Sequence, residues 1–220
     1  MSGASRAAPE LLLATLSPDK QRRLRWIVAG LPFRIFTPTA ADAAGAPAER
    51  GATHRDIAAQ KAAWWSGRRA CLALASDGGV EIPALGAEWR SVRTRRASGA
   101  STDAERVADL LRRLAGAEGE ERSAWWIEAL ALAHRGALVD AWEARGPRLQ
   151  VREQEAGARP EGGFWLETLL ADPASGRALA TMSARERRPF DRPWLELRRR
   201  ARRRLLDWKA QQEGARVPVR

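Results

Sequence analysis

The chain has 220 residues, of which 45% are hydrophobic and 30% are charged. This composition supports a globular domain with a real core and excludes a wholly disordered protein. The formal net charge is +11, and the lone cysteine, Cys71, excludes a disulfide within the chain and a multi-cysteine zinc site.

The positive charge is concentrated towards the C-terminal end, where residues 185–220 hold 13 of the 38 Lys and Arg residues. All but three of the 38 are arginine, a bias that coding composition alone can cause. We therefore favour a solvated basic helix face over a nucleic-acid-binding surface. No apolar run approaches the roughly 20 residues of a membrane span, and no secretory signal is recognised. We expect a cytoplasmic enzyme or binding protein.

The first half of the chain alternates predicted strands and helices. Short apolar runs before turn signals predict the strands, and Ser, Thr and Pro at helix-start positions predict the helices. In order, we expect a loose leader over Met1–Pro9, a strand over Glu10–Thr15, a helix from Pro18 to Gly30, a strand over Phe33–Phe36, a loop over Thr37–Gly51, a helix capped by Thr53 and ending near Ser66, a strand over Arg69–Ala75 that ends in a turn at Asp77-Gly78-Gly79, and a further strand over Val80–Ile82.

The second half is predicted to contain one helix, several strands and a final helix. In order, we expect a loop over Pro83–Gly99, an amphipathic helix capped by Ser101 or Thr102 and closed by Gly116, antiparallel strands over Ser123–Ala133, Ala137–Glu143 and Leu149–Glu155, a flexible loop over Gly157–Gly163, strands over Phe164–Ala171 and Arg177–Met182, and an amphipathic helix over Pro193–Ala210. Strand–helix–strand units followed by many strands predict an α/β domain with a mixed sheet. We place this domain at residues 10–212, with a tail over 213–220.

Polar residues follow predicted buried strands, which is where open α/β sheets hold ligands. The segment Ala14–Lys20 joins a strand to a helix N-terminus that can attract an anion, and Lys20 could reach a phosphate. The segment Ser76–Gly79 exposes the carboxylate of Asp77, which could hold Mg²⁺ or orient a water molecule. Helix capping and a plain hairpin turn are the ordinary alternatives for these two segments.

A third polar segment, Gly162–Glu167, follows the predicted flexible loop. The glycine pair could place Phe164 against a flat ligand, and Glu167 could accept hydrogen bonds from that ligand. A core strand entered through a loop is the ordinary alternative.

The order and spacing of these segments resemble the inosine/xanthosine triphosphate pyrophosphatase family. The family's Ala-Thr-x-Asn-x-x-Lys is matched by Ala14-Thr15-Leu16-Ser17-Pro18-Asp19-Lys20, its Asp-Asp-Ser-Gly-Leu and following Ala-Leu-Gly by Ser76-Asp77-Gly78-Gly79-Val80 and Ala84-Leu85-Gly86, its Ala-Thr-Asp-Ala-Glu-Arg by Ser101–Arg106, and its Gly-Gly-Phe-Gly-Tyr-Asp-Pro in part by Gly162–Glu167. The similarity covers residues 10–210, and the collinear series carries it.

The resemblance implies an elongated mixed α/β sheet flanked by helices, with two lobes around a central cleft, in a homodimer. It implies Mg²⁺-dependent hydrolysis of a nucleoside triphosphate to a monophosphate and pyrophosphate. By position, it implies Asp77 and Lys20 as catalytic residues and Glu49 with Asp77 as metal ligands, and it places Asp56 on the family's acidic position in the second helix. The implied substrate-binding residues are Thr15, Ser17, Lys20, Lys61, Phe164, Glu167, Arg187 and Arg192. Such a set suits phosphoryl transfer, in which negative charge spreads over the phosphate oxygens.

The chain departs from the family's pattern mainly where the base is read. Trp165, Leu166, Glu167 and Thr168 stand where Gly, Tyr, Asp and Pro are expected. We therefore expect the base preference to differ more than the phosphate chemistry. His54 and His134 have no partner spacing for a metal site, and we interpret both as surface or strand residues.

Two alternatives stay open. A catalytically silent relative would bind a nucleotide or a protein partner without turnover. A nucleic-acid-binding protein would use Arg198–Arg204, although Leu195, Leu205 and Trp208 supply an apolar face that would pack this helix onto the domain.

Overall fold

A six-stranded mixed sheet forms the centre of the structure, a computed structural model that describes residues 7–46, 48–94, 99, 101–158 and 164–214. The strands are β1 (Glu10–Leu13), β2 (Arg34–Phe36), β3 (Leu72–Glu81), β4 (Ser123–His134), β5 (Ala137–Val151) and β6 (Leu170–Ala171), in the spatial order β2-β1-β3-β4-β5-β6. β1 pairs in parallel with β2 and β3, and the other neighbours pair antiparallel.

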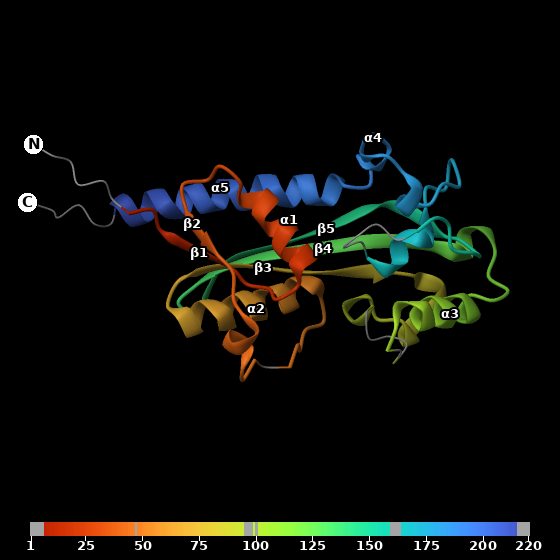
Figure 1. Cartoon of the computed structure of the whole chain (residues 1–220), viewed down its shortest axis with the longest axis horizontal. Coiled ribbons are helices and arrows are strands. Elements are labelled where there is room, and N and C mark those ends of the chain that lie inside the picture. Colours follow the sequence, from red (N-terminus) through yellow and green to blue (C-terminus); the bar gives the residue numbers. More distant parts are fainter. Residues whose placement is uncertain (1–6, 47, 95–98, 100, 159–163, 215–220) are drawn as a thin grey trace, which may run out of the picture.

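Helices cover both faces of this sheet (Figure 1). They are α1 (Pro18–Val28), α2 (His54–Arg69), α3 (Asp103–Arg113), α4 (Ala184–Arg187) and α5 (Arg192–Gly214). On one face, α1 and α5 pack against the sheet through large residues such as Leu24 and Leu197. On the other face, α2 contributes small residues, including Ala58 and Ala62, which let the helix approach the strands closely. Because successive side chains of a strand point to opposite faces, the short β1 serves both layers.

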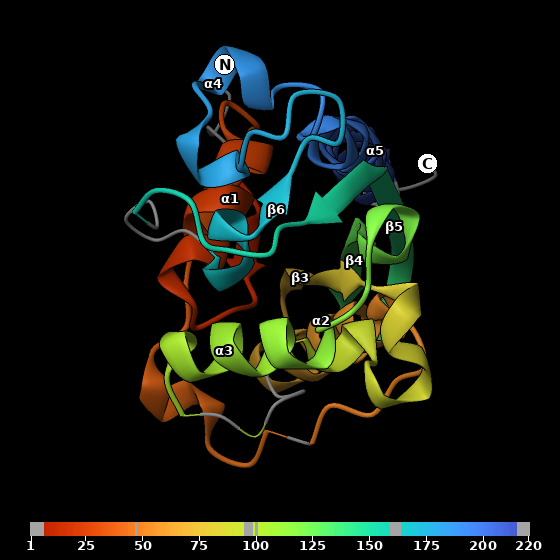
Figure 2. The ribbon, with the colours of Figure 1, turned by 90° about the vertical axis from the view of Figure 1, so that its right-hand side faces the viewer.

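Seen end-on, α1 and the segment around β6 and α4 lie on one side of the end of β3, and α3 lies on the other (Figure 2). A third apolar cluster holds this end of the molecule together. It includes Val107 and Leu110 of α3 and Leu166 and Leu179 from the segment that follows β5.

Two predicted helix starts are confirmed. The Thr53 hydroxyl accepts the N–H of Asp56 at 3.1 Å, and the Thr102 hydroxyl accepts the N–H of Glu105 at 3.2 Å. In both cases the acidic side chain accepts the N–H of the capping threonine in return, which completes a capping box.

The predicted turn at Asp77-Gly78-Gly79 is wrong, because these residues lie inside the ten-residue strand β3. β3 pairs with β4 without interruption from Leu72 to Glu81. At Gly78, a Cβ atom would lie 2.1 Å from a carboxylate oxygen of Glu128 on β4. Gly78 therefore allows β3 and β4 to pack closely. In the sequence alone, an aspartate followed by a glycine is typical of a turn.

The predicted strands over Phe164–Ala171 and Arg177–Met182 are wrong over most of their length. The first contains a 3₁₀ turn at Trp165–Thr168 before the two-residue β6, and the second contains an isolated bridge at Ala178 and another 3₁₀ turn. Their apolar side chains are buried in the third apolar cluster, to which both α3 and the strands β3, β4 and β5 contribute. A short apolar run does not by itself distinguish a strand from a buried turn.

The predicted strands Ala137–Glu143 and Leu149–Glu155 are parts of one strand, β5, which ends at Val151. Pro147 lies within it, where the register with β4 shifts between Trp125 and Ile127. A bulge is one of the few places at which a strand tolerates proline, so the apparent break is local.

Helix α5 uses several of its arginines within the fold. Arg202 donates to the carbonyls of Ile27 and Ala29 at 3.1 and 2.7 Å, and so caps the end of α1. The Arg198 guanidinium lies 4.6 Å from the ring centroid of Trp26. Leu205 and Trp208 are buried as predicted, but Leu195 is 44% exposed.

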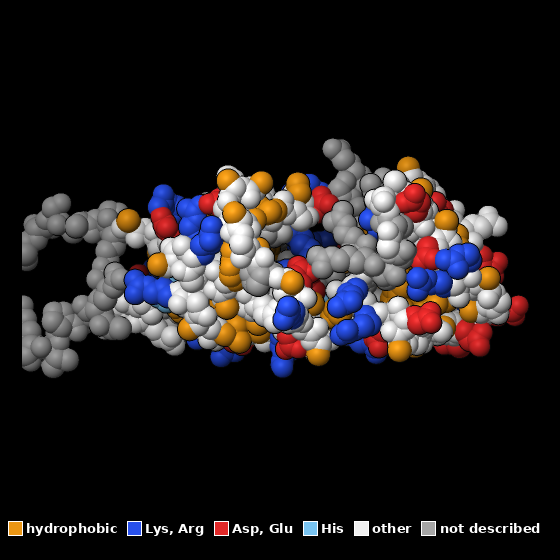
Figure 3. Space-filling model, turned by 90° about the horizontal axis from the view of Figure 1, so that it is seen from below, with side chains coloured by type: hydrophobic (Ala, Val, Ile, Leu, Met, Phe, Trp, Pro, Cys, Tyr) orange, Lys and Arg blue, Asp and Glu red, His pale blue; other side chains and the backbone are white. Residues whose placement is uncertain are grey.

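The surface seen from the α2 side carries interspersed basic and acidic side chains rather than a continuous basic patch (Figure 3). Although α5 spans 23 residues, no helix in the described part of the chain is both long and apolar enough to cross a membrane.

Candidate functional site

A cleft of about 850 Å³ opens beside β3, beyond the point at which β1 ends. β1 stops at Leu13, and the N–H of Ala14 makes one more backbone hydrogen bond to β3, to the carbonyl of Leu74 at 2.8 Å. The edge of β3 from Ser76 to Gly79 therefore lines the cleft, together with the first turn of α1. A strand end beside a helix N-terminus is a common ligand site in α/β proteins.

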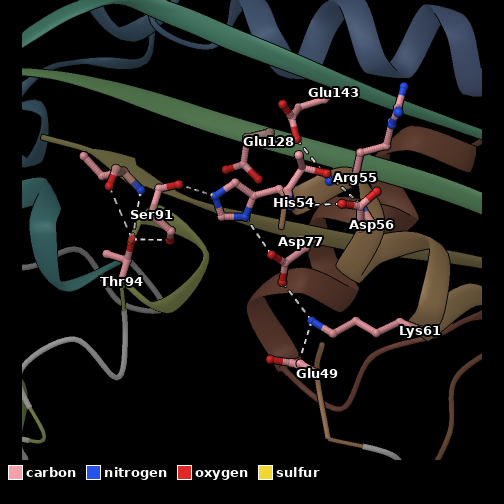
Figure 4. Close-up of polar contacts among 12 residues, drawn as sticks. Glu49, His54, Arg55, Asp56, Lys61, Asp77, Ser91, Thr94, Glu128 and Glu143 are labelled. Atoms are coloured by element: carbon pink, nitrogen blue, oxygen red, sulfur yellow. Dashed lines mark hydrogen bonds and ion pairs between the residues drawn. The ribbon is translucent and has the colours of Figure 1, made fainter. Parts of the chain in front are cut away.

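Asp77 is the centre of a charged cluster in this cleft (Figure 4). Its Oδ1 lies 2.8 Å from Nζ of Lys61 and 3.7 Å from Nζ of Lys20, and its Oδ2 lies 2.7 Å from Nδ1 of His54. Burial alone would raise the pKa of Asp77, but the hydrogen bond from His54 and the charges of Lys20 and Lys61 outweigh it and lower this pKa to about 2. Asp77 is therefore a buried carboxylate that stays ionised.

Helix α2 brings His54 and Lys61 to the same carboxylate. The two residues are seven positions apart, so they lie two turns apart on one face of the helix. Lys61 also contacts Oε1 of Glu49 at 2.7 Å, so two carboxylates meet at one ammonium group. Burial acts to lower the pKa of Lys61, but the charges and hydrogen bonds of Asp77 and Glu49 outweigh it and raise this pKa.

Lys20 reaches the cluster from the first turn of α1. Burial lowers its pKa, and the like charge of Lys61 lowers it further. An anion that enters the cleft would stabilise the charged form of Lys20, because its charge offsets the repulsion from Lys61.

Glu128 lies on β4, lines the cleft and is 7% exposed. The indole N–H of Trp126 donates to its Oε1. Burial raises the pKa of Glu128 to about 8, against the opposing effects of the Trp126 hydrogen bond and of the charges of Lys20 and Arg23. The cleft therefore contains a carboxyl group that keeps its proton near neutral pH.

The Glu128→Gln variant should become more stable relative to the native protein as the pH rises. Folded Glu128 holds its proton more tightly than the unfolded side chain, whose pKa is near 4.5, so folding stability falls between about pH 4.5 and pH 8. Gln cannot ionise and removes this loss. Urea unfolding at pH 5 and pH 8 measures the difference, with Glu143→Gln as the exposed control. An equal difference at both pH values would show that Glu128 ionises normally.

Aromatic side chains line the other end of the cleft. The rings of Trp126 and Phe164 meet edge to face with centroids 5.4 Å apart, and Trp165 lies beside Phe164. Glu167 is held by Arg187, whose Nη1 lies 2.7 Å from its Oε2, and its other carboxylate oxygen accepts the N–H of Phe164 at 3.5 Å. This end offers flat apolar surface, which suits a ring.

The structure brings most of the residues implied by the resemblance to this cleft. Those that line it are Thr15, Ser17, Lys20, Glu49, Lys61, Asp77, Phe164 and Glu167. Arg187 reaches it through Glu167, whereas Arg192 begins α5 and is not among the described residues that line the cleft. Asp56 lies in the exposed capping box with Thr53. Gly162 and Gly163, and the termini beyond residues 7 and 214, lie outside the described residues.

The interpretation of His54 as a surface or strand residue is wrong. It is the first residue of α2, is 2% exposed, and contacts Asp77 directly. Its place after a capping threonine and seven residues before Lys61 is the local signal that could have indicated it. His134 is a strand residue, as expected, at the end of β4. Glu128 and Trp126 were also missed, since an alternating strand shows no local sign of facing a cleft.

Comparison with known proteins agrees with this architecture. Residues 11–208 match the Ham1 family. A dITP/XTP pyrophosphatase of Thermus thermophilus is 36% identical over 180 residues, covering 81% of this chain and 83% of that protein. A dITP/XTP pyrophosphatase of Anaeromyxobacter sp. is 30% identical over 207 residues, covering 81% and 89%.

Solved structures show the same fold. A HAM1 protein from Coxiella burnetii superposes with a TM-score of 0.74 at 23% identity, covering 90% of this chain and 99% of that one. The Staphylococcus aureus Ham1 protein gives a TM-score of 0.71 at 17% identity, covering 94% and 100%. These similarities confirm the predicted mixed α/β fold.

Proposed function

The chain belongs to the Ham1 family, and from that premise we propose that it hydrolyses non-standard purine nucleoside triphosphates to a monophosphate and pyrophosphate. The observation that carries the proposal is the polarity of one cleft: Lys20, Lys61 and Glu49 gather around Asp77 at one end, and the rings of Trp126, Phe164 and Trp165 line the other. A nucleoside triphosphate has the same two ends. The similar proteins named dITP/XTP pyrophosphatase support the substrate class.

At the charged end, the chain supplies groups that hold a polyanion. Ser17, the N-cap residue before α1, makes no side-chain capping hydrogen bond in the described structure, so N–H groups of the first turn after Pro18 remain for a phosphate oxygen. Lys20 and Lys61 add positive charge on two sides of Asp77. These groups are already in position before the reaction, which is how charge that develops in a phosphoryl-transfer transition state is stabilised.

The carboxylates fit a magnesium ion that is shared with the substrate. No group of three or more His, Cys, Asp or Glu side chains in the described residues could hold a metal alone. Mg²⁺ usually binds one or two protein carboxylates alongside phosphate oxygens and water. Asp77 and Glu49, which both contact Lys61, would supply these carboxylates. When bound, Mg²⁺ neutralises charge on the phosphates. With a pKa of about 2, Asp77 is a weak base, so it holds and orients a water molecule rather than carrying its proton away.

At the aromatic end, Phe164 provides the surface on which the base stacks. Phe164→Leu should raise KM for the nucleotide about tenfold and leave kcat within about threefold, since a stacked base is worth about 1–3 kcal/mol. Steady-state kinetics measures both constants. Phe190→Leu is the matched control, because Phe190 packs in the same apolar cluster but does not line the cleft among the described residues. An unchanged KM in Phe164→Leu would place the base elsewhere.

A pyrophosphate-release assay tests the function directly. Purified protein with Mg²⁺ should release pyrophosphate from dITP and XTP faster than from the standard nucleotides, and EDTA should stop the reaction. Binding of these nucleotides by calorimetry without any release would instead identify a catalytically silent relative. Neither binding nor release, with the circular dichroism spectrum of a folded protein, would refute the proposal.

We also propose that the protein is a homodimer, on the resemblance alone. Light scattering of the purified protein checks this proposal. A mass of twice the 24.2 kDa of one chain is expected, and a mass of 24.2 kDa would contradict it.

A further inference from the structure

We propose that His54 is a positioning residue: held by Ser91, it fixes the carboxylate of Asp77 so that one oxygen stays turned towards Lys20 and Lys61. The inference rests on the proposed hydrolysis, because Asp77 is taken as the residue that acts on the substrate. Neither His54 nor Ser91 is among the site residues that the resemblance implies.

The contacts of the His54 ring are specific at both nitrogens. Nδ1 lies 2.7 Å from Oδ2 of Asp77, and Nε2 lies 3.2 Å from Oγ of Ser91. An ionised carboxylate only accepts hydrogen bonds, so Nδ1 must carry the proton that is shared with Asp77. The Ser91 hydroxyl can either donate or accept, so it satisfies Nε2 in either role. The carboxylate of Asp77 therefore fixes the proton on Nδ1, and Ser91 holds the other side of the ring.

The two oxygens of Asp77 have separate partners as a result. His54 holds Oδ2, and the lysines face Oδ1. Without His54, Oδ2 would be a buried acceptor without its donor, and the carboxylate could turn away from the cleft to find another. Positioning groups of this kind hold a reacting side chain close to its productive geometry.

Close packing against β3 keeps Ser91 in place. A Cβ atom on Gly79 would lie 2.2 Å from the carbonyl oxygen of Ser91 and 2.9 Å from Cε1 of His54, so only glycine lets the turn and the ring lie against the strand here. Thr94 closes this turn, because its hydroxyl donates to the Ser91 carbonyl at 2.6 Å and accepts the N–H of Val80 at 3.0 Å. The turn that supports His54 is thus tied to the same strand that carries Asp77 (Figure 4).

The order Ser91, His54, Asp77 is also that of a nucleophile, a base and an orienting acid. The burial of the ring argues for positioning instead. His54 is 2% exposed, and neither His54 nor Ser91 is among the described residues that line the cleft. Ser91→Ala separates the two: positioning predicts that kcat falls only severalfold, whereas a nucleophilic serine would lose all activity.

Kinetics of two His54 variants tests the positioning role. His54→Phe keeps a ring of similar size without a donor and should lower kcat about 10–100-fold, with KM for dITP changed less than about threefold. His54→Asn places an amide N–H near the position of Nδ1 and should recover most of kcat. His134→Asn, at the other histidine of the chain, is the control. Native kcat in His54→Phe, or equal losses in His54→Phe and His54→Asn, would overturn the proposal.

A spectroscopic measurement tests the contact without turnover. Nitrogen-15 labelling of histidine should show one exchange-protected Nδ1–H resonance, which is absent from His54→Phe, present in His134→Asn and shifted in Asp77→Asn. A proton found on Nε2 alone would overturn the proposal even in an active enzyme. If the resonance is present but no nucleotide is hydrolysed, the hydrogen bond exists but the proposed function is wrong. The proposed role of this contact in catalysis is then wrong as well.

Discussion

Asp77→Asn should reduce pyrophosphate release by about 10³-fold or more, the largest effect expected of any single substitution in this protein. Asn has the size of Asp and can still accept from Lys61, but it carries no negative charge. The substitution therefore removes the ionised group that is surrounded by His54, Lys20 and Lys61. It should lower kcat far more than it raises KM, because the lysines that we propose as phosphate-binding residues remain.

Three measurements separate this result from simple unfolding. Differential scanning fluorimetry should show a folded Asp77→Asn protein, and calorimetry should show that it still binds dITP. Asp140→Asn, on β5 and 3.9 Å from Arg204, is the matched control and should keep native activity. A folded Asp77→Asn protein with more than about a tenth of native kcat would show that Asp77 is not the reacting centre.

Lys20→Met should lower kcat/KM about 10²–10³-fold, the second largest effect. Lys61 is engaged by Asp77 and Glu49 at 2.8 and 2.7 Å, whereas the ion pair of Lys20 with Asp77 spans 3.7 Å. Lys20 is therefore the ammonium group with more capacity left for a phosphate oxygen. Burial and the like charge of Lys61 both lower the pKa of Lys20, and a bound phosphate would favour its charged form again.

The same reasoning predicts the effect on stability. Replacing a partly buried ammonium group that faces another ammonium by an apolar chain of similar length should leave the free energy of unfolding unchanged or raise it. Urea unfolding checks this, and Lys20→Arg should recover part of the activity by restoring the charge. Lys209→Met is the control, since Lys209 pairs with Glu213 near the end of α5. Equal activity of Lys20→Met and Lys209→Met would contradict the assignment.

Prediction from sequence succeeded where the signal was local. The strand before Thr15 and the helix that starts at Pro18 place Lys20 in a first turn, and the Thr53 cap places Lys61 two turns into α2. Each of these predictions depends on residues within about one helical turn of one another. The backbone conformations of such residues depend mainly on their own side chains.

Prediction failed where a partner far along the chain decided the outcome. Asp77-Gly78-Gly79 has the local sequence of a turn, but all ten residues of β3, including these three, pair with β4. The side chain of Glu128 fills the space that Gly78 leaves. Phe164–Ala171 has the composition of a strand, but most of it forms a 3₁₀ turn that is buried between α3 and the sheet. In both places tertiary packing outweighs local propensity.

The amino-acid sequence alone determined the mixed α/β fold, the family resemblance and the order of the charged residues along the chain. Only the tertiary structure decided that His54 and Asp77, 23 residues apart, share a hydrogen bond, and that Glu128 is buried in the same cleft. The physical reason is that the ionisation and orientation of a side chain depend on burial and on the charges around it. In this protein those surroundings are created by the register of β3 with β4 and by the packing of α1 and α2 on opposite faces of the sheet.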